Sequence, residues 1–236
     1  MLVWSDEFNS DYLDTNTWSV GIGDESLGRE AYATDRSVNL HVVDGHLEIV
    51  ALHEDYQGKH YTTSGILTKD AGSWQYGRIE ASMKVPVGKG CWPAFWMMPQ
   101  YNIYGSGPPF GWSWPRNGEI DIMESISQEP SHVYGTMHFV EEEKHASLGG
   151  MYEHGGPIDD GYHVYSIVWT EDEITWFFDD QEFYRADAGS ERDGILPFHQ
   201  EFYILVNLAL GSPWAETPEP SVYPQVLLVD WIRVWQ

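Results

Sequence analysis

GEIDIMES, residues 118 to 125, is the stretch from which both the fold and the chemistry of this chain can be inferred. It places Glu119, Asp121 and Glu124 close together, and the alternating isoleucines between them indicate a β-strand. Side chains alternate between the two faces of a strand, so Glu119 and Asp121 share a face while Glu124 should point the other way. A β-bulge at residues 122–123 would absorb one residue and return Glu124 to the face of Glu119, with the isoleucines toward the core.

Two carboxyl groups on one strand face are the equipment of a retaining glycoside hydrolase, which needs them about 5 to 5.5 Å apart. Acids are abundant here, 37 in 236 residues, so this spacing of three acids is expected about once by chance. The context favours catalysis over chance. Gly118 precedes the strand, a Trp-Pro pair stands at 114–115, and aromatic residues are dense on both sides.

The chain resembles glycoside hydrolase family 16, specifically its laminarinase-like branch. The resemblance rests on GEIDIMES, on YGRIEASMKVPVGKGCWPAFWMMP at 76–99 and on VDWIRVWQ at 229–236. Weaker matches are TMHF at 136–139, DDGYHVYSIVWTEDEITWFFD at 159–179 and FYILVNLALGSPW at 202–214. These segments cover most of the chain in the order found in the family.

The resemblance implies an all-β fold, a jelly-roll sandwich of two curved antiparallel sheets whose concave face forms a cleft for a polysaccharide. By the family's motif, Glu119 would be the nucleophile and Glu124 the acid that protonates the leaving oxygen, with Asp121 between them. Three crowded carboxyls repel one another, so at least one pKa should be raised, which would keep Glu124 protonated while Glu119 stays charged.

Composition is consistent with one catalytic domain spanning residues 1–236, because a chain with 12 tryptophans can bury a large core. The net charge of −25 argues against nucleic acid, an anionic membrane or a heavily sulfated glycan as partner. No apolar run is long enough to span a membrane, and MLVWSDEF at the N-terminus lacks the features of a signal peptide.

Cys91 is the single cysteine, so no intramolecular disulfide can form, and a small buried hydrophobe is the expected role. The resemblance to secreted polysaccharide hydrolases implies an extracellular protein whose leader is absent from this sequence. No feature demands a partner protein, so a monomer is expected.

Short strands with turn signals recur along the chain. Residues 79–85 alternate apolar and polar side chains, and hairpins are predicted at 42–47 and 174–184, where Asp-Gly and Asp-Asp pairs separate apolar runs. The segment 100–117, rich in Gly, Pro and aromatics, is predicted to be a loop that walls the cleft. The segment 141–157 is predicted to be a second, more solvated loop.

Trp92, Ala94 and Trp96 are spaced to lie on one face of a strand, where a flat sugar could stack on the indoles. Tryptophan is equally common in protein cores, so burial is the alternative for each. Further candidates for sugar contacts are Arg78, Trp112, Trp114 and Trp214.

His138 lies on a predicted strand soon after the motif and could hydrogen-bond Asp121 or another carboxylate; a purely structural histidine is the alternative. The other nine histidines show no metal-ligand spacing and give no zinc signal. No cofactor is needed for the reaction.

The resemblance also implies a structural Ca²⁺ on the convex side, held by Glu7, Gly45 and Asp230, since Ca²⁺ prefers carboxylate and carbonyl oxygens. Each acid could equally be an ordinary surface residue. Asn39 matches an asparagine that relatives place near the substrate. One departure is the segment 28–33, GREAYA, where relatives that cut β-1,3-glucan often carry Asn-Glu-Leu-Gln-Tyr-Tyr.

The function expected from the resemblance is an endo-acting β-1,3-glucanase. The alternatives are cleavage of another β-glucan or of a galactan such as agar, a transglycosylase, and a glucan-binding module without catalysis. Both motif glutamates are present, which disfavours the binding module.

Overall fold

Two sheets packed face to face make up the fold, which a computed structural model describes for residues 1–236. The ten-stranded sheet runs β15 (Gln181–Asp187), β14 (Glu173–Phe178), β13 (His163–Trp169), β8 (Gly77–Lys84), β17 (Gln225–Trp235), β5 (His46–Tyr56), β6 (Lys59–Thr63) and β3 (Tyr32–Ala33), with β1 (Leu2–Asp6) paired to β17 and β4 (Leu40–Val43) paired to β5. The seven-stranded sheet runs β12 (Lys144–Glu153), β11 (His132–Glu141), β10 (Glu119–Glu124), β9 (Cys91–Pro99), β16 (Phe202–Leu210), β7 (Gly65–Leu67) and β2 (Ser19–Val20). The only helices are short, α1 (Glu25–Gly28) and the 3₁₀ turn η1 (Pro220–Val222).

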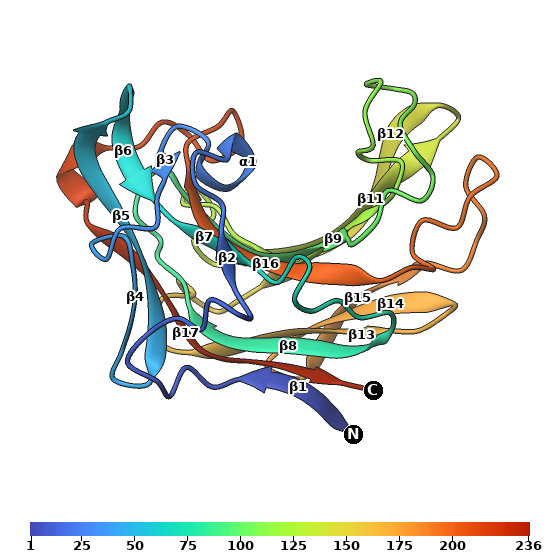
Figure 1. Cartoon of the computed structure of the whole chain (residues 1–236), viewed down its shortest axis with the longest axis horizontal. Helices are drawn as coiled ribbons and strands as arrows, with labels where there is room; N and C mark the ends of the chain where they lie inside the picture. Colours follow the sequence, from blue (N-terminus) through green and yellow to red (C-terminus); the bar gives the residue numbers. More distant parts are fainter.

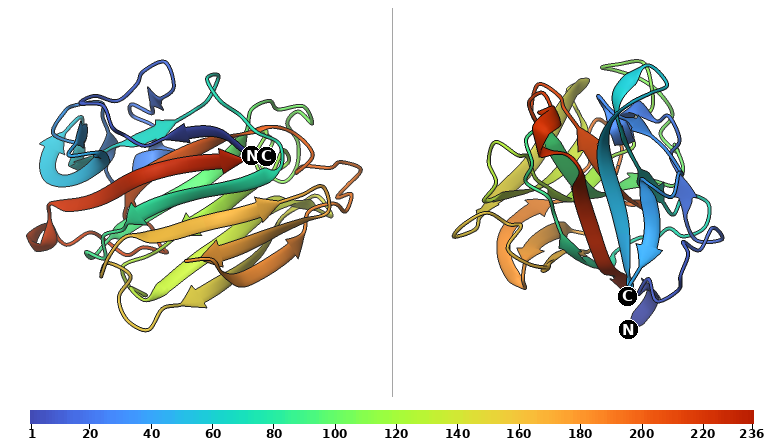
Figure 2. Two further views of the ribbon diagram at one scale, coloured as in Figure 1. Left: turned by 90° about the horizontal axis from the view of Figure 1, so that it is seen from below. Right: turned by 90° about the vertical axis from the view of Figure 1, so that its left-hand side faces the viewer.

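The seven-stranded sheet is strongly curved. In Figure 1 its concave face opens upward, between β11 and β12 on one side and α1, β3 and β6 on the other. Strands β8, β13 and β14 of the ten-stranded sheet lie beneath the seven-stranded sheet, on its convex side. Figure 2 shows that the two termini end next to each other on the same side of the molecule. Every strand pairing is antiparallel except the short β3–β6 pair. The predicted all-β jelly roll is therefore confirmed. No helix is long or apolar enough to span a membrane.

Alternation of apolar side chains builds the core between the sheets. In β8, Ile79, Ala81 and Met83 are fully buried, as the alternating pattern predicts, and they join a cluster of 43 buried apolar residues. Cys91 belongs to the same cluster, as expected of a small hydrophobe. Burial raises the pKa of its thiol to about 12, so the thiol is inert at neutral pH.

The predicted bulge is present in β10. The register of β10 against β9 and β11 shifts between Asp121 and Glu124, and Ile122 and Met123 are both buried in the core. Because two successive residues face the core, the alternation resumes with Glu124 on the face that carries Glu119.

Both predicted hairpins are present. Asp44 and Gly45 join β4 to β5 with φ angles of 51° and 80°, and Asp179 and Asp180 join β14 to β15 with φ angles of 46° and 63°. Positive φ at both central residues is the geometry whose twist matches that of the flanking strands, and Asp and Gly tolerate it best. The segment 100–117 is irregular, as predicted, and wraps beside the cleft.

The prediction of a solvated loop over 141–157 is wrong for most of that segment. β12 pairs with β11 along its whole length, from His132 opposite Glu153 to Glu141 opposite Lys144. The strand lies at the edge of its sheet, so many of its side chains face water and its composition is that of a loop.

Gly135 on β11 allows close packing between the sheets, and its replacement by alanine should be destabilising. A Cβ at this position would lie 2.2 Å from Cδ1 of Trp176, a fully buried residue of β14. Overpacking of this kind costs about 1–3 kcal/mol. We expect Gly135→Ala to lower the melting temperature by several degrees, measured by differential scanning calorimetry. Gly161→Ala is the control, because a Cβ at Gly161 meets no atom within 4 Å; equal effects in both variants would contradict the packing explanation.

Candidate active site

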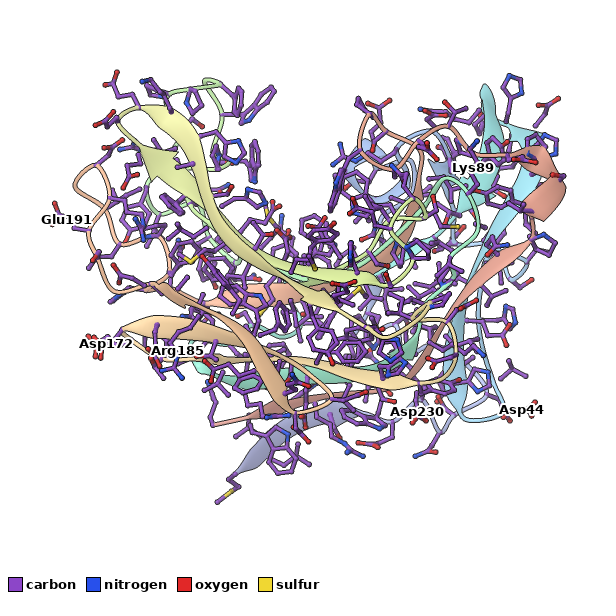
Figure 3. The ribbon with its side chains drawn as sticks, turned by 180° about the vertical axis from the view of Figure 1, so that it is seen from behind. Asp44, Lys89, Asp172, Arg185, Glu191 and Asp230 are labelled. Carbon is purple, nitrogen blue, oxygen red and sulfur yellow. The ribbon has the colours of Figure 1, made fainter.

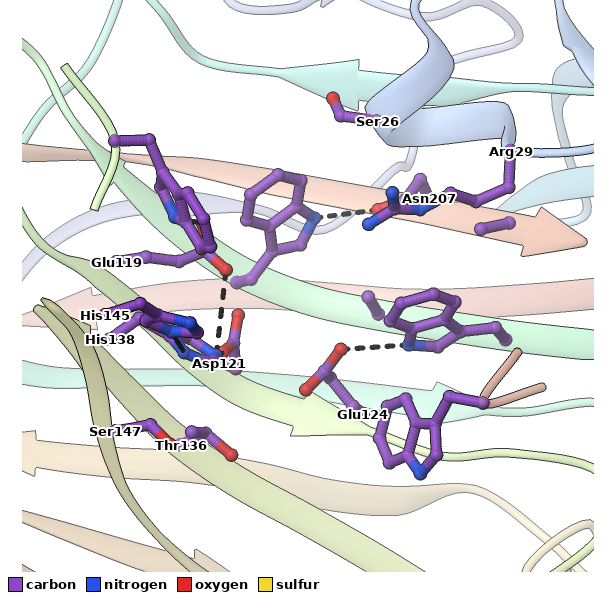
Figure 4. Close-up of a pocket in the computed structure, with 16 residues that line it drawn as sticks. Ser26, Arg29, Glu119, Asp121, Glu124, Thr136, His138, His145, Ser147 and Asn207 are labelled. Carbon is purple, nitrogen blue, oxygen red and sulfur yellow. Dashed lines mark hydrogen bonds and ion pairs between the residues drawn. The ribbon is translucent and has the colours of Figure 1, made fainter. Parts of the chain in front are cut away.

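A cleft of about 430 Å³ lies on the concave face of the seven-stranded sheet. Strands β9, β10, β11, β12 and β16 form its floor, α1 and the residue after it line one wall, and Trp114 from the segment 100–117 lines the other. Figure 4 shows that Glu119, Asp121 and Glu124 all project into it from β10. The structure therefore brings together the three carboxyls predicted from the motif.

Each glutamate is held by an indole. Nε1 of Trp114 donates a hydrogen bond to Oε2 of Glu119 over 2.6 Å, and Nε1 of Trp92 donates one to Oε1 of Glu124 over 2.9 Å. A donor on one oxygen leaves the other carboxylate oxygen for the substrate. Trp114 is thus oriented toward the predicted nucleophile, a contact that the sequence did not indicate.

His138 faces Asp121, as predicted. Its Nε2 lies 3.0 Å from Oδ2 of Asp121 and 4.0 Å from Oε1 of Glu119. Its Nδ1 lies 2.9 Å from Nε2 of His145 on β12, so one of these two rings donates a hydrogen bond to the other. The sequence held no signal for His145, because the segment that carries it, 141–157, was predicted to be a loop.

Burial raises the pKa of all three carboxyls. The pKa of Glu124 rises to about 8, chiefly through loss of hydration and then through repulsion by Asp121, and loss of hydration also raises the pKa of Asp121 to about 8. The pKa of Glu119 is raised for the same two reasons, with His138 acting in the opposite direction. We expected a raised pKa for at least one of the three carboxyls, and all three are raised. Glu119 and Asp121 interact strongly, so their titrations belong to the pair.

Trp92, Ala94 and Trp96 line the cleft side by side on β9, as their spacing predicts. Nε1 of Trp96 is bonded to Oδ1 of Asn207 over 2.7 Å, which fixes the indole on the cleft floor. Trp214 also lines the cleft and packs edge-on against Trp92, with ring centroids 5.2 Å apart. Trp112 is 58% exposed and does not line this cleft.

Arg29 is a cleft residue that the prediction missed. It follows α1 with a φ of 58°, and its guanidinium lies 4.9 Å from the ring centre of Trp92. It belongs to the segment 28–33, which departs from the sequence that relatives often carry there. The sequence therefore drew attention to this position, but it contained no motif that would have identified Arg29 as a cleft residue. Ser26 and Asn207 were missed as well.

Two predicted substrate contacts are wrong. Asn39 is fully buried outside the cleft, where its Nδ2 donates to the carbonyl of Val50 and to Oγ1 of Thr62. Arg78 lies on β8 of the other sheet and is paired with Glu80 and Asp180. Both side chains are bonded to other protein groups, and neither lines the cleft.

The three predicted calcium ligands come to one edge of β17. Along that edge, β17 pairs with β5 up to Val229, which lies opposite Leu47, and it pairs with β1 from Ile232, which lies opposite Asp6. Gly45, Asp230 and Glu7 therefore lie beside the gap between these two pairings. Figure 3 shows Asp230 and the neighbour of Gly45, Asp44, on the same side, away from the cleft.

These donors fit a hard cation in type, because they offer two carboxylates and a turn carbonyl. Asp230 has only a weak contact, with Oγ of Ser82 at 3.4 Å. Glu7, however, is bound through both oxygens by Arg233, at 2.9 and 2.7 Å, and would have to exchange that partner for an ion.

Comparisons with known proteins identify the family of the chain. Residues 28–233 match the family described as glycosyl hydrolases family 16. Over its full length the chain is 38% identical to a β-glucanase from Rhodothermus marinus, of which it covers 85%, and 34% identical to a glucan endo-1,3-β-glucosidase from Cryptopygus antarcticus, of which it covers 92%. The X-ray structure of the laminarinase from Rhodothermus marinus superposes with a TM-score of 0.90 at 36% identity, covering 100% of this chain and 96% of the other. The chain therefore belongs to glycosyl hydrolase family 16.

Proposed function

We propose that this protein is an endo-acting β-1,3-glucanase that hydrolyses its substrate with retention of anomeric configuration. The observation that carries the proposal is the bulge in β10, which turns Glu124 onto the face of Glu119 in an open cleft lined by tryptophans. The relatives named as β-glucanase, endo-1,3-β-glucosidase and laminarinase support the choice of substrate.

The first half-reaction uses both glutamates. The carboxylate of Glu119 attacks the anomeric carbon while the glycosidic bond breaks, and Glu124 gives its proton to the departing oxygen. Of the two, only Glu119 has His138 within 4.0 Å, and a positive imidazolium there favours the ionised form of Glu119. The raised pKa of Glu124 favours the protonated form that this step requires.

The second half-reaction reverses the roles. Glu124, now ionised, takes a proton from water, which attacks the anomeric carbon and releases Glu119. We assign Asp121 and His138 to proton balance, because the ring of His138 sits against Asp121 at 3.0 Å and reaches toward Glu119. Trp92 and Trp114 hold the two carboxyls in position through their indole hydrogen bonds.

The cleft lining favours a neutral glucan over a sulfated galactan. Arg29 is the only arginine or lysine that lines it, and three carboxyls share the same space. A sulfate group needs several positive charges, and here it would find a single arginine beside three carboxyl groups. Trp92, Trp96 and Trp214 instead offer apolar faces on which sugar rings can pack.

The experiment that tests the proposal measures reducing ends released from laminarin, lichenan, agarose and κ-carrageenan. We expect release from laminarin, with a broad range of oligosaccharides early in the reaction, as internal cleavage requires. Release only from a galactan would overturn the substrate and keep the mechanism. No release from any polymer would favour a binding module, and products longer than the starting oligosaccharide, detected by mass, would indicate transglycosylation.

We also propose that the protein acts outside the cell, because a polymeric glucan cannot cross a membrane to reach it. Fractionation of the native host, with activity assayed in medium and lysate, tests this; activity confined to the lysate would refute it.

A structural Ca²⁺ held by Asp230, the carbonyl of Gly45 and Glu7 is a further part of the proposal. A ligand that binds only the folded state at 100 times its Kd stabilises by about 2.7 kcal/mol. We expect added Ca²⁺ to raise the melting temperature of EDTA-treated protein by several degrees, and Asp230→Asn to abolish the rise. An equal rise in both proteins would argue against this site.

A further inference from the structure

A second cluster of metal-ligating side chains lies outside the cleft, where the chain passes from β12 to β13. It consists of His154, Asp160 and His163, each of which offers one ligand atom within 4.8 Å of the others. His154 follows the last residue of β12, His163 is the first residue of β13, and Asp160 lies in the loop between them. The loop therefore folds back so that its two ends and its middle meet.

Both histidines have Nδ1 bonded to an acceptor. Nδ1 of His163 lies 2.7 Å from Oδ2 of Asp179, in the turn between β14 and β15, and Nδ1 of His154 lies 3.0 Å from the carbonyl oxygen of Gly156. Nδ1 is therefore the protonated nitrogen of His154 when that ring is neutral, and its Nε2 is left with its lone pair. In His163 both nitrogens face carboxylates, and a neutral ring with its proton on Nδ1, toward Asp179, leaves Nε2 for an ion beside Asp160. Histidines that ligate a metal are typically fixed in this way, by a carboxylate or a backbone carbonyl on the other nitrogen.

We propose that His154, Asp160 and His163 bind a zinc-class divalent cation through the two Nε2 atoms and a carboxylate oxygen, with water as the fourth ligand. Nitrogen and carboxylate ligands in a tetrahedral arrangement suit Zn²⁺ and its neighbours in the first transition row. With neutral histidines, Asp160 and the supporting Asp179 carry two negative charges, which balance a divalent ion. Calcium is disfavoured, because it takes oxygen ligands.

His163 and Asp160 need only a small adjustment to share an ion. Nε2 of His163 now lies 2.8 Å from Oδ1 of Asp160. Two tetrahedral ligands about 2.0 Å from zinc are about 3.3 Å apart, so these atoms must separate by roughly half an ångström. Asp160 is 60% exposed on a loop and can move by that amount, whereas His163, only 11% exposed, is held by Asp179.

A proton is the competing occupant, because a protonated His163 could bridge Asp160 and Asp179. That bridge accounts for one histidine and two carboxylates, but it gives no role to His154. The ring of His154 packs edge-on against that of His163, with centroids 5.2 Å apart, where a second positive ring would be repelled. A metal ion uses both rings, and this convergence is what favours the ion.

The ion would fasten the two sheets together rather than take part in hydrolysis. β12 belongs to the seven-stranded sheet, and β13 and the β14–β15 turn belong to the ten-stranded sheet. Along β12, the cleft residue Ser147 precedes His154 by seven positions, a distance of roughly 20 Å in an extended strand. The site therefore adds stability at the end of the sandwich remote from Glu119.

The test is zinc binding by full-length protein stripped with EDTA and assayed in excess Ca²⁺, which occupies any oxygen-ligand site. We expect one Zn²⁺ per chain by isothermal titration calorimetry, and a rise in melting temperature of about 5 °C at 100 times Kd. Asp160→Asn and His154→Ala should each weaken zinc binding at least tenfold. Asp179→Asn, which removes the support of His163, should weaken it by about 10- to 100-fold.

The matched control is His60→Ala. His60 also pairs with an aspartate, Asp55, at 2.6 Å, but both are exposed and no third ligand is near them. Glu119→Gln is a second control, because Glu119, Asp121 and His138 also lie close enough to hold an ion. Loss of zinc binding in His154→Ala and Asp160→Asn with retention in both controls supports the site. Zinc binding that survives in His154→Ala, or that is lost in Glu119→Gln, or the absence of binding in the wild type, would overturn it.

Discussion

Replacing Glu119 by glutamine should abolish hydrolysis of laminarin, with kcat falling at least ~10⁴-fold, as the loss of a catalytic nucleophile does in other enzymes. Glutamine has the shape of glutamate and can still accept the hydrogen bond from Nε1 of Trp114. The variant should therefore fold and bind substrate normally. The measurement is the initial rate of reducing-end release at saturating laminarin, together with the affinity for laminari-oligosaccharides by calorimetry.

The control is Glu191→Gln, the same substitution at an exposed residue away from the cleft, which should retain full activity. Azide separates the roles of the two glutamates. In Glu119→Gly, azide should attack an activated glycosyl donor directly and give the α-glycosyl azide, whereas in Glu124→Ala it should attack the glycosyl-enzyme and give the β-azide. The opposite pairing of products would reverse the assignment, and wild-type activity in Glu119→Gln would refute it.

Much of this active site follows from local rules. The parity of a strand required a bulge in GEIDIMES, and the structure places it between Asp121 and Glu124. The spacing of Trp92 and Trp96 put both on one face of β9 for the same reason. Such inferences succeed because side-chain direction on a strand depends only on neighbouring residues.

Inferences that depend on pairing between distant segments were less successful. Arg78 could hydrogen-bond a sugar, but its strand β8 lies in the ten-stranded sheet, where it pairs with β13 and β17. Asn39 was placed by resemblance alone, and the fold uses its amide to join buried backbone and side-chain groups. Neither outcome can be derived without knowing which sheet receives each strand.

Because the segment 141–157 was predicted to be a loop, the positions of two of its histidines were missed as well. Its polar, glycine-rich sequence is typical of a loop, yet backbone pairing with β11 makes it the strand β12. Once β12 is in place, His145 reaches the cleft and His154 meets His163. The histidines lacked metal-ligand spacing in sequence because their proximity arises from the turn of the chain between two sheets.

Glu124 should make the protein less stable as pH rises, and Glu124→Gln should remove part of that loss. The folded state raises the pKa of Glu124 from 4.5 to about 8, so it binds the proton more tightly than the unfolded chain does. The free energy of unfolding therefore falls as pH increases between these two values. Each unit of difference is worth about 1.4 kcal/mol, so the loss amounts to a few kcal/mol. A neutral glutamine avoids it.

We expect Glu124→Gln to melt at the same temperature as the wild type at pH 4 and roughly 5 °C higher at pH 8.5, measured by calorimetry. Glu191→Gln removes the same charge from an exposed position, so it separates the effect of burial from that of net charge, which is −25. A gain in Glu124→Gln that is equal at both pH values, or that Glu191→Gln reproduces, would contradict the explanation.

The proton on Glu124 also determines how the wild-type rate depends on pH. We expect kcat/KM to fall above about pH 8, because Glu124 must be protonated to release the leaving group. The raised pKa of Glu124 thus lowers the stability of the protein in alkaline solution, and it also favours a protonated acid at neutral pH.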